Sequence, residues 1–127
     1  MKIIESILRF EKHYDGILKL KNEDLREYLI YNTMAMECFQ AINALIEIGE
    51  YIVTKYKLGF PSTYRQIFEI LYNEKYITKE EFEVFKRLVF LRNLISHEYY
   101  TISAEELLEM SNLFDKIAGF IKQIKQK

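Results

Sequence analysis

Residues that break helices are almost absent from this chain. Its 127 residues include one proline, Pro61, and four glycines. Apolar residues recur at the three- and four-residue spacing of an α-helix, and no segment shows an apolar–polar alternation long enough for a β-strand. The sequence therefore predicts an all-α fold, an antiparallel helical bundle of four to five helices, as one domain over residues 1–127.

Turn and capping signals divide the chain into expected helices. The first two are expected at residues 3–20 and 23–57, and a short third helix, capped by Ser62 or Thr63, reaches residue 72. A fourth starts after Thr78 and continues through Arg92, and a fifth starts after residue 103. Asn22 is the expected N-cap of the second helix, and Gly59 the expected residue at its C-terminal end. Thr78 and Ser103 each stand three residues before a glutamate, which is the pattern of a capping box.

The expected second helix carries two apolar stripes, so it should be buried against more than one neighbour. A third stripe is polar and comprises Gln40, Asn43, Glu47, Glu50 and Thr54. The simplest interpretation of this stripe is a face in contact with solvent. The alternative is that Asn43 or Glu47 faces a functional site elsewhere in the bundle.

Composition excludes several classes of protein. The net charge of −1 gives no overall basic signature, so a nucleic-acid partner would need a local cationic patch. A single cysteine, Cys38, excludes an internal disulfide and a multi-cysteine metal site, and we expect it to be a small core residue. We expect no metal, cofactor, signal peptide or membrane span, and the cytoplasm as the default location.

The segment Arg92-Asn93-Leu94-Ile95-Ser96-His97-Glu98-Tyr99 concentrates chemically useful side chains. A permanent cation, a histidine and a phenol lie within eight residues. The guanidinium of Arg92 can bind two phosphate oxygens, and His97 can exchange a proton near neutral pH. Arg92 also continues an apolar helix face, where a cation that only contacts solvent is unexpected. The other histidine, His13, has no partner at ligand spacing, so we expect it at the surface or at the edge of a helix face.

Arginine, four residues, histidine, one residue and tyrosine resembles the signature of the HepT-like ribonuclease toxins of the HEPN superfamily. Further landmarks come in the same order as in that family. They are Tyr51-Ile52-Val53, Phe60-Pro61-Ser62-Thr63-Tyr64, Ile67-Phe68-Glu69-Ile70-Leu71 and Phe90-Leu91-Arg92-Asn93. The resemblance covers nearly the whole chain.

The resemblance implies a metal-independent endoribonuclease that works as a homodimer with a composite cleft. Arg92 and His97 would be catalytic, and Asn93 and Tyr99 supporting. It also implies a partner, an MntA-like nucleotidyltransferase antitoxin that attaches AMP to Tyr99. Tyr100 is the neighbouring candidate for that modification.

The spacing of Arg92 and His97 leaves two arrangements open. Five residues turn through about 140° of a helix, so the two side chains cannot share one face of a straight helix. Either the helix ends near Ser96, or two copies of the motif meet across a two-fold axis. Two functions other than cleavage also remain: a non-catalytic nucleotide- or RNA-binding module, and a purely structural helical partner.

Overall fold

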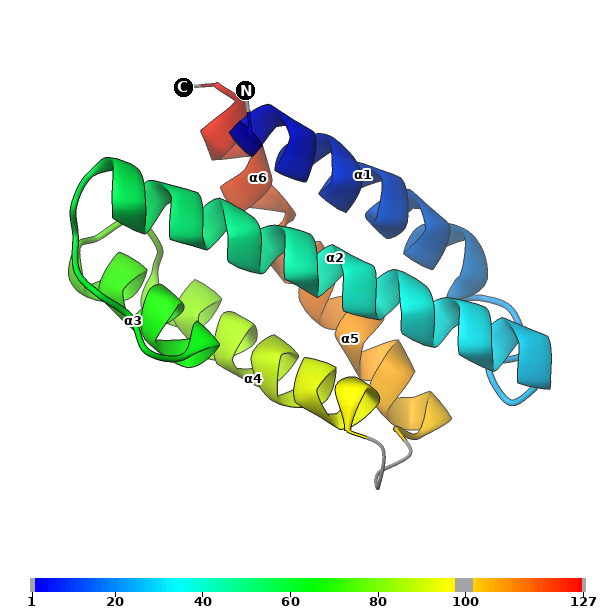
Figure 1. The fold of residues 1–127 in the computed structure, drawn as a ribbon. Coiled ribbons are helices and arrows are strands. Elements are labelled where there is room, and N and C mark those ends of the chain that lie inside the picture. The colour runs from blue at the N-terminus through cyan, green and yellow to red at the C-terminus, as the bar shows by residue number, and fades with distance from the viewer. Residues whose placement is uncertain (1, 98–101, 127) are drawn as a thin grey trace.

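The computed structural model describes residues 2–97 and 102–126. Within these ranges the chain is all-helical, with no strand, and the helices form an antiparallel bundle (Figure 1). The helices are α1 (Lys2–Leu20), α2 (Tyr28–Lys55), α3 (Tyr64–Asn73), α4 (Lys79–Ser96), α5 (Ala104–Lys116) and α6 (Ala118–Lys125). The predicted fold class is confirmed. None of the described helices is both long enough and apolar enough to cross a membrane.

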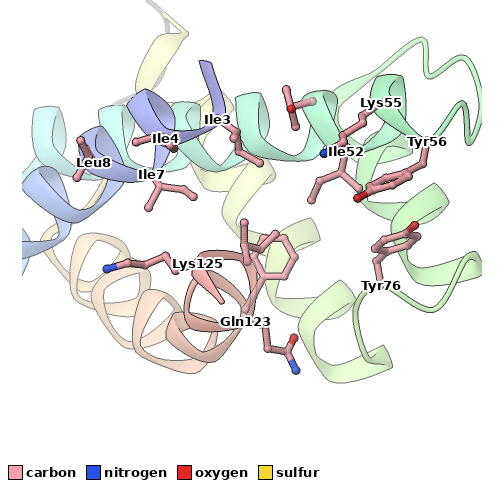
Figure 2. A pocket seen from close by; sticks show the side chains of 13 residues that line it. Ile3, Ile4, Ile7, Leu8, Ile52, Lys55, Tyr56, Tyr76, Gln123 and Lys125 are labelled. Atoms are coloured by element: carbon pink, nitrogen blue, oxygen red, sulfur yellow. The ribbon is translucent and has the colours of Figure 1, made fainter. Parts of the chain in front are cut away.

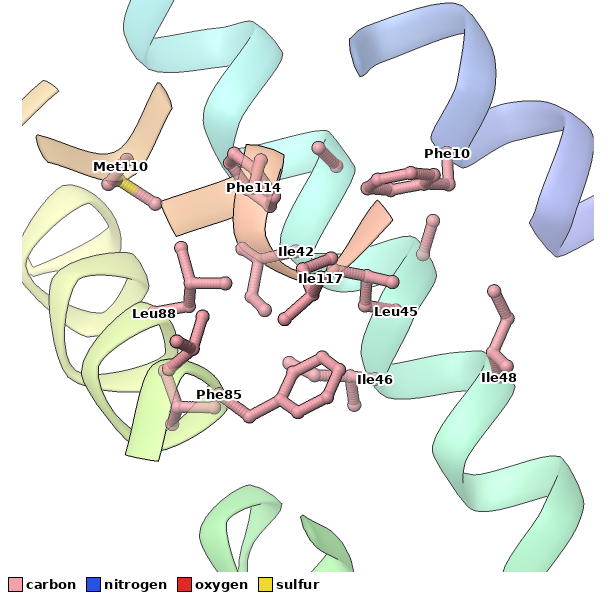
Figure 3. Close-up of a cluster of buried hydrophobic side chains, with 14 of the residues drawn as sticks. Phe10, Ile42, Leu45, Ile46, Ile48, Phe85, Leu88, Met110, Phe114 and Ile117 are labelled. Carbon is pink, nitrogen blue, oxygen red and sulfur yellow. The ribbon is translucent and has the colours of Figure 1, made fainter. Parts of the chain in front are cut away.

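Helix α2 is the centre of the bundle. It packs against α1, α3, α4 and α5. Its two apolar stripes are both buried, as the sequence predicted. Figure 3 shows Ile42 and Leu45 of α2 directed toward Leu88 of α4 and Phe114 of α5. Helix α2 is therefore the element that four other helices share in the core.

Three of the helices begin at the predicted caps. The hydroxyls of Thr63, Thr78 and Ser103 each accept a hydrogen bond from the backbone N–H three residues later, at 3.0–3.1 Å. Thr78 and Ser103 form complete capping boxes. These caps involve contacts within four residues, which explains why the sequence alone predicted them correctly.

The predicted start of α2 was wrong. The helix begins at Tyr28, and Glu27 is its N-cap, with a carboxylate oxygen accepting from the N–H of Ile30 at 2.9 Å. The side chain of Asp24 instead accepts from the N–H of Arg26, which makes a local turn. Leu25 is buried in that turn. Asn22 is therefore not the N-cap, because the chain forms a turn that buries Leu25 before the helix begins.

The predicted end of α2 was also wrong. The C-cap is Tyr56, and Lys57 follows with a φ of 53°. The N–H of Leu58 bonds to the carbonyl of Val53 and that of Lys57 to the carbonyl of Thr54, which is a Schellman motif. A lysine thus takes the left-handed position that we had expected of Gly59.

The expected fifth helix is two helices. It breaks at Ile117, which is buried. At the break, backbone N–H groups bond to carbonyls three residues earlier: the N–H of Ile117 to the carbonyl of Phe114, and the N–H of Phe120 to the carbonyl of Ile117. The break redirects α6 toward the beginning of α1 (Figure 1). It also brings the ring of Phe120 edge-on to Phe85, with centroids 5.4 Å apart. The helix expected from residue 103 onward is therefore divided into α5 and α6, and both contribute buried side chains to the core.

Candidate functional site

Arg92 projects from α4 toward α2 and is partly buried. Its Nε donates a hydrogen bond to Oδ1 of Asn43 at 2.9 Å. Its Nη1 donates to Oδ1 of Asn93 at 3.1 Å. Among the described residues, these are the two acceptors that bond this guanidinium, which has five N–H groups in all. The guanidinium is therefore oriented by two side chains before any ligand arrives.

Two aromatic rings flank the same guanidinium. The centroids of Phe39 on α2 and Tyr64 on α3 each lie 5.0 Å from the central carbon of Arg92. Contacts of this kind stabilise a cation without neutralising it. Arg92 thus stands where α2, α3 and α4 meet. Neither ring was predicted as part of the site, although Phe39 lies one helical turn before Asn43 on α2.

The described partners of Arg92 differ from those of other arginines in the chain. Arg9, Arg26 and Arg87 each contact a glutamate, namely Glu47, Glu105 and Glu109. The two side chains that bond Arg92 are amides, which carry no charge. A carboxylate would offset the positive charge of the guanidinium, whereas an amide only orients it. Within residues 2–97 and 102–126, no carboxylate offsets the charge of Arg92.

The polar stripe of α2 divides between two neighbours. Asn43 faces Arg92, whereas Glu47 faces α1, where it accepts hydrogen bonds from Ser6 at 3.0 Å and from Arg9. Of the two residues considered for the site, the structure brings only Asn43 to it. The simple interpretation of this stripe as a solvated face is wrong at both positions, because each side chain bonds another helix.

His97 lies at the end of α4. The last helical residue is Ser96, and His97 is the exposed C-cap with extended backbone angles, φ −88° and ψ 121°. The helix ends where the first of the two predicted arrangements requires. Asn93, one turn earlier, bonds Arg92. Tyr99 and Tyr100 lie outside the described residues.

The chain is described again from Ile102, which is buried. Its carbonyl accepts a hydrogen bond from the hydroxyl of Tyr31 on α2. Burial, and secondarily the carboxylate of Glu106, raise the pKa of the Tyr31 hydroxyl, so it remains a donor at neutral pH. Both ends of the segment that carries Tyr99 are therefore fixed, one by α4 and the other by α2.

His13 is not a simple surface residue. Its Nδ1 lies 2.6 Å from Oε1 of Glu37 on α2, and both side chains are mostly buried. No local sequence pattern predicts this pair, because the partners lie on different helices. No group of three potential metal ligands occurs among the residues that the structure describes.

An apolar cavity of about 550 Å³ lies between the beginning of α1, the end of α2 and α6. Figure 2 shows Ile3, Ile7 and Ile52 around it, with Lys55 and Lys125 at its edge. Lys125 is bound to Glu11 at 2.8 Å, and Lys55 lies over two tyrosine rings. Neither Arg92 nor His97 lines this cavity. The candidate site is therefore the Arg92 region and not this cavity.

Comparison with known proteins decides the family. The family described as ribonuclease HepT-like matches residues 3–124. This chain belongs to the HepT-like family. No curated protein matches the chain significantly.

Solved structures share the HepT-like fold. A toxin–antitoxin with AMP-PNP aligns with a TM-score of 0.89 and 20% identity, over 98% of each chain. A tri-AMPylated Shewanella oneidensis HEPN toxin in complex with an MNT antitoxin aligns with a TM-score of 0.87 and 22% identity, over 98% of this chain and 97% of that one. YutE, a cytosolic protein of unknown function from Bacillus subtilis, aligns with a TM-score of 0.84 and 20% identity, over 98% and 87%. At these identities the alignments establish the fold.

Proposed function

We propose that this HepT-like chain is a metal-independent endoribonuclease toxin acting in the cytoplasm, with Arg92 and His97 as its catalytic residues. The observation that carries the proposal is the environment of Arg92, an oriented cation whose two bonded partners in the described part of the chain are neutral amides. A cation in such an environment is better suited to binding a phosphate than to a purely structural role. Asn93 and Asn43 act as positioning residues, because each holds one nitrogen of the guanidinium.

The proposed reaction is transfer of the phosphate to the neighbouring 2′-oxygen. A base removes the 2′-hydroxyl proton, a P–O2′ bond forms and the P–O5′ bond breaks. An acid then protonates the departing 5′-oxygen, leaving a cyclic 2′,3′-phosphate and a 5′-hydroxyl. His97 serves as the base or the acid, because imidazole exchanges protons near neutral pH. Arg92 stabilises the negative charge on the phosphorane oxygens.

We propose that two copies of the chain complete the site. Arg92 points toward α2 and α3, whereas His97 follows the end of α4. A two-fold axis that joined two copies at this region would place the His97 of one copy near the Arg92 of the other. Large apolar side chains remain exposed on both helices that carry the site, with 55% of Met36 and 51% of Phe90 accessible. Such residues favour a homodimer interface.

We propose that an MntA-like nucleotidyltransferase is the antitoxin and that it attaches AMP to Tyr99. Two solved structures of the same fold are described as a toxin–antitoxin with AMP-PNP and as an AMPylated toxin with its antitoxin. A nucleotide attached close to Arg92 and His97 would add a negative charge where the substrate phosphate binds. The modification would thus occupy the site and pair with its cation.

RNA cleavage in EDTA tests the enzymatic proposal. Purified, unmodified wild type should cleave RNA, and His97→Ala and Arg92→Ala should not. Arg26→Ala removes an exposed arginine and is the matched control. If wild type cleaves no more RNA than His97→Ala, the enzymatic proposal is wrong. Tight binding that depends on Arg92 and leaves RNA intact would favour the alternative, a non-catalytic nucleotide- or RNA-binding module.

A further inference from the structure

A second cavity adjoins Arg92. It has a volume of about 480 Å³, within the range of roughly 300–1,000 Å³ that is typical of small-ligand sites. Its lining comes from three elements and the segment before α3. The lining residues are Glu50, Pro61, Ser62, Thr63, Tyr64, Arg65, Ile67, Val89 and Asn93.

Two of the lining residues also contact Arg92. Asn93 accepts a hydrogen bond from its Nη1, and the ring of Tyr64 lies 5.0 Å from its central carbon. A phosphate held by Arg92 would therefore lie at the edge of this cavity. The nucleotide on one side of that phosphate can extend into the cavity, since Tyr64 and Asn93 border both.

The lining suits a nucleobase. Ile67 and Val89 are buried and present an apolar floor, and Pro61 adds to it. The ring of Tyr64 is 40% exposed, so its surface remains available for stacking. Aromatic side chains next to a cation are the usual platform for bases of single-stranded RNA. An apolar floor beside one exposed ring therefore favours a flat heterocycle over a small inorganic ion.

The charged side chains that line the cavity indicate how a ligand would be oriented in it. Arg65 is exposed, and the ion pairs found among the described residues do not include it. Glu50, from α2, is the only acid among the described residues of the lining. A cation suits a phosphate oxygen, and a carboxylate suits the N–H donors on the edge of a base. The phosphate end of a ligand should therefore lie at Arg65 and the base edge at Glu50.

We propose that this cavity is the subsite for the nucleotide next to the scissile phosphate, an inference that rests on the proposed ribonuclease function. Tyr64 stacks on the base, Arg65 binds the following phosphate and Glu50 accepts hydrogen bonds from the base. Guanine fits best, because its N1–H and N2 amino group can both donate to one carboxylate. The subsite gives the segment Phe60-Pro61-Ser62-Thr63-Tyr64 a role in choosing where RNA is cut.

Fluorescence anisotropy with a labelled 2′-O-methyl oligonucleotide tests the subsite without needing catalysis, since that RNA lacks the attacking hydroxyl. We expect Tyr64→Leu to weaken binding about tenfold, and Tyr64→Phe to restore it, because a stacked base depends on the ring. Arg65→Gln should weaken binding and lower the slope of log affinity against log salt by about one. The matched controls are Tyr28→Leu, at another exposed first residue of a helix, and Arg26→Gln.

Base preference tests the role of Glu50. Oligonucleotides that carry one guanine or one adenine in an otherwise uridine sequence should differ in affinity for wild type, with guanine preferred. Glu50→Gln should reduce that preference, because an amide offers a single acceptor oxygen and introduces competing donors. Glu69→Gln, an exposed glutamate on α3, should keep it.

The outcomes separate the subsite from the enzymatic proposal. If RNA is cleaved through Arg92 while Tyr64→Leu and Arg65→Gln bind as wild type does, the subsite is wrong and the ribonuclease stands. If binding depends on Tyr64 and Arg65 but RNA stays intact, the subsite stands and catalysis is wrong. If wild type neither binds nor cleaves RNA, both are wrong.

Discussion

The Nε of Arg92 on α4 donates a hydrogen bond to Oδ1 of Asn43 in the middle of α2, at 2.9 Å. This bond joins the helix that carries the candidate site to the central helix of the bundle. Because the acceptor is an amide, it fixes the guanidinium without removing its charge.

Asn43→Asp should weaken RNA binding more than its small change in shape suggests. A carboxylate can accept the same hydrogen bond, but it neutralises the charge that Arg92 offers to phosphate. We expect affinity to fall about tenfold and the salt slope to fall by about one. Asn32→Asp adds the same charge at an exposed position of α2 and is the control. Equal affinities for the two variants would contradict the proposed role of the Arg92 charge.

Gly49→Ala should destabilise the fold. A Cβ at Gly49 would lie 2.8 Å from Cγ2 of Ile67 and 3.5 Å from the ring of Phe68, so α3 would have to shift. Overpacking costs about 1–3 kcal/mol, which exceeds the helix gain of roughly 0.5–1 kcal/mol for alanine over glycine. Gly119→Ala meets nothing within 4 Å and should instead stabilise by that gain. Urea denaturation measures both, and a stabilised Gly49→Ala would contradict the packing at α3.

Cys38 should resist alkylation in the folded protein. Burial, and secondarily the charge of Glu37, raise the pKa of its thiol, so very little thiolate exists at pH 8. The side chain is also inaccessible in the core. We expect iodoacetamide to label Cys38 only after denaturation, as measured by intact mass. Rapid stoichiometric labelling of the native protein would show that the core around Cys38 opens readily.

The homodimer makes a separate prediction. Light scattering at micromolar concentration should give twice the 15.4 kDa mass of the chain. Phe90→Glu places a charge on an exposed apolar site of α4 and should shift the protein toward monomer. Leu18→Glu, on α1, is the control and should leave the mass unchanged. A monomeric wild type would contradict both the proposed interface and the proposed composite site.

The proposed silencing of the toxin depends on the hydroxyl of Tyr99. Protein produced together with an MntA-like partner should gain mass in whole AMP units, and peptide mapping should place the modification on Tyr99. Tyr99→Phe lacks the only atom that can accept the nucleotide, so it should escape modification and harm cells more than wild type does when the antitoxin is present. Modification of Tyr100 would move the assignment by one residue. An active partner that modifies neither residue would leave steric masking as the means of silencing.

Local sequence patterns predicted most of the fold. The sequence shows few helix breakers and two apolar stripes on α2. It also shows the capping residues Thr63, Thr78 and Ser103. These features depend on residues within a few positions of one another, so they can be recognised in the sequence alone. Residue types and the family resemblance singled out Arg92 and His97, but the sequence left open whether α4 ends near Ser96, and the structure shows that it does. The start of α2 and the break at Ile117 were missed, because burial of Leu25 and of Phe120 depends on other helices.

The partners of Arg92 could be decided only by the tertiary structure. Asn43 lies 49 positions away in the chain, and the sequence left Asn43 and Glu47 as equal alternatives. Because α2 packs against α1, Glu47 accepts a hydrogen bond from Arg9. Because α2 also packs against α4, Asn43 accepts one from Arg92. Sequence thus determined which residues carry charge and which faces are apolar. The crossing of α2, α3 and α4 decided that Arg92 meets two amides and two rings, because side chains distant in sequence become neighbours only when the core is packed.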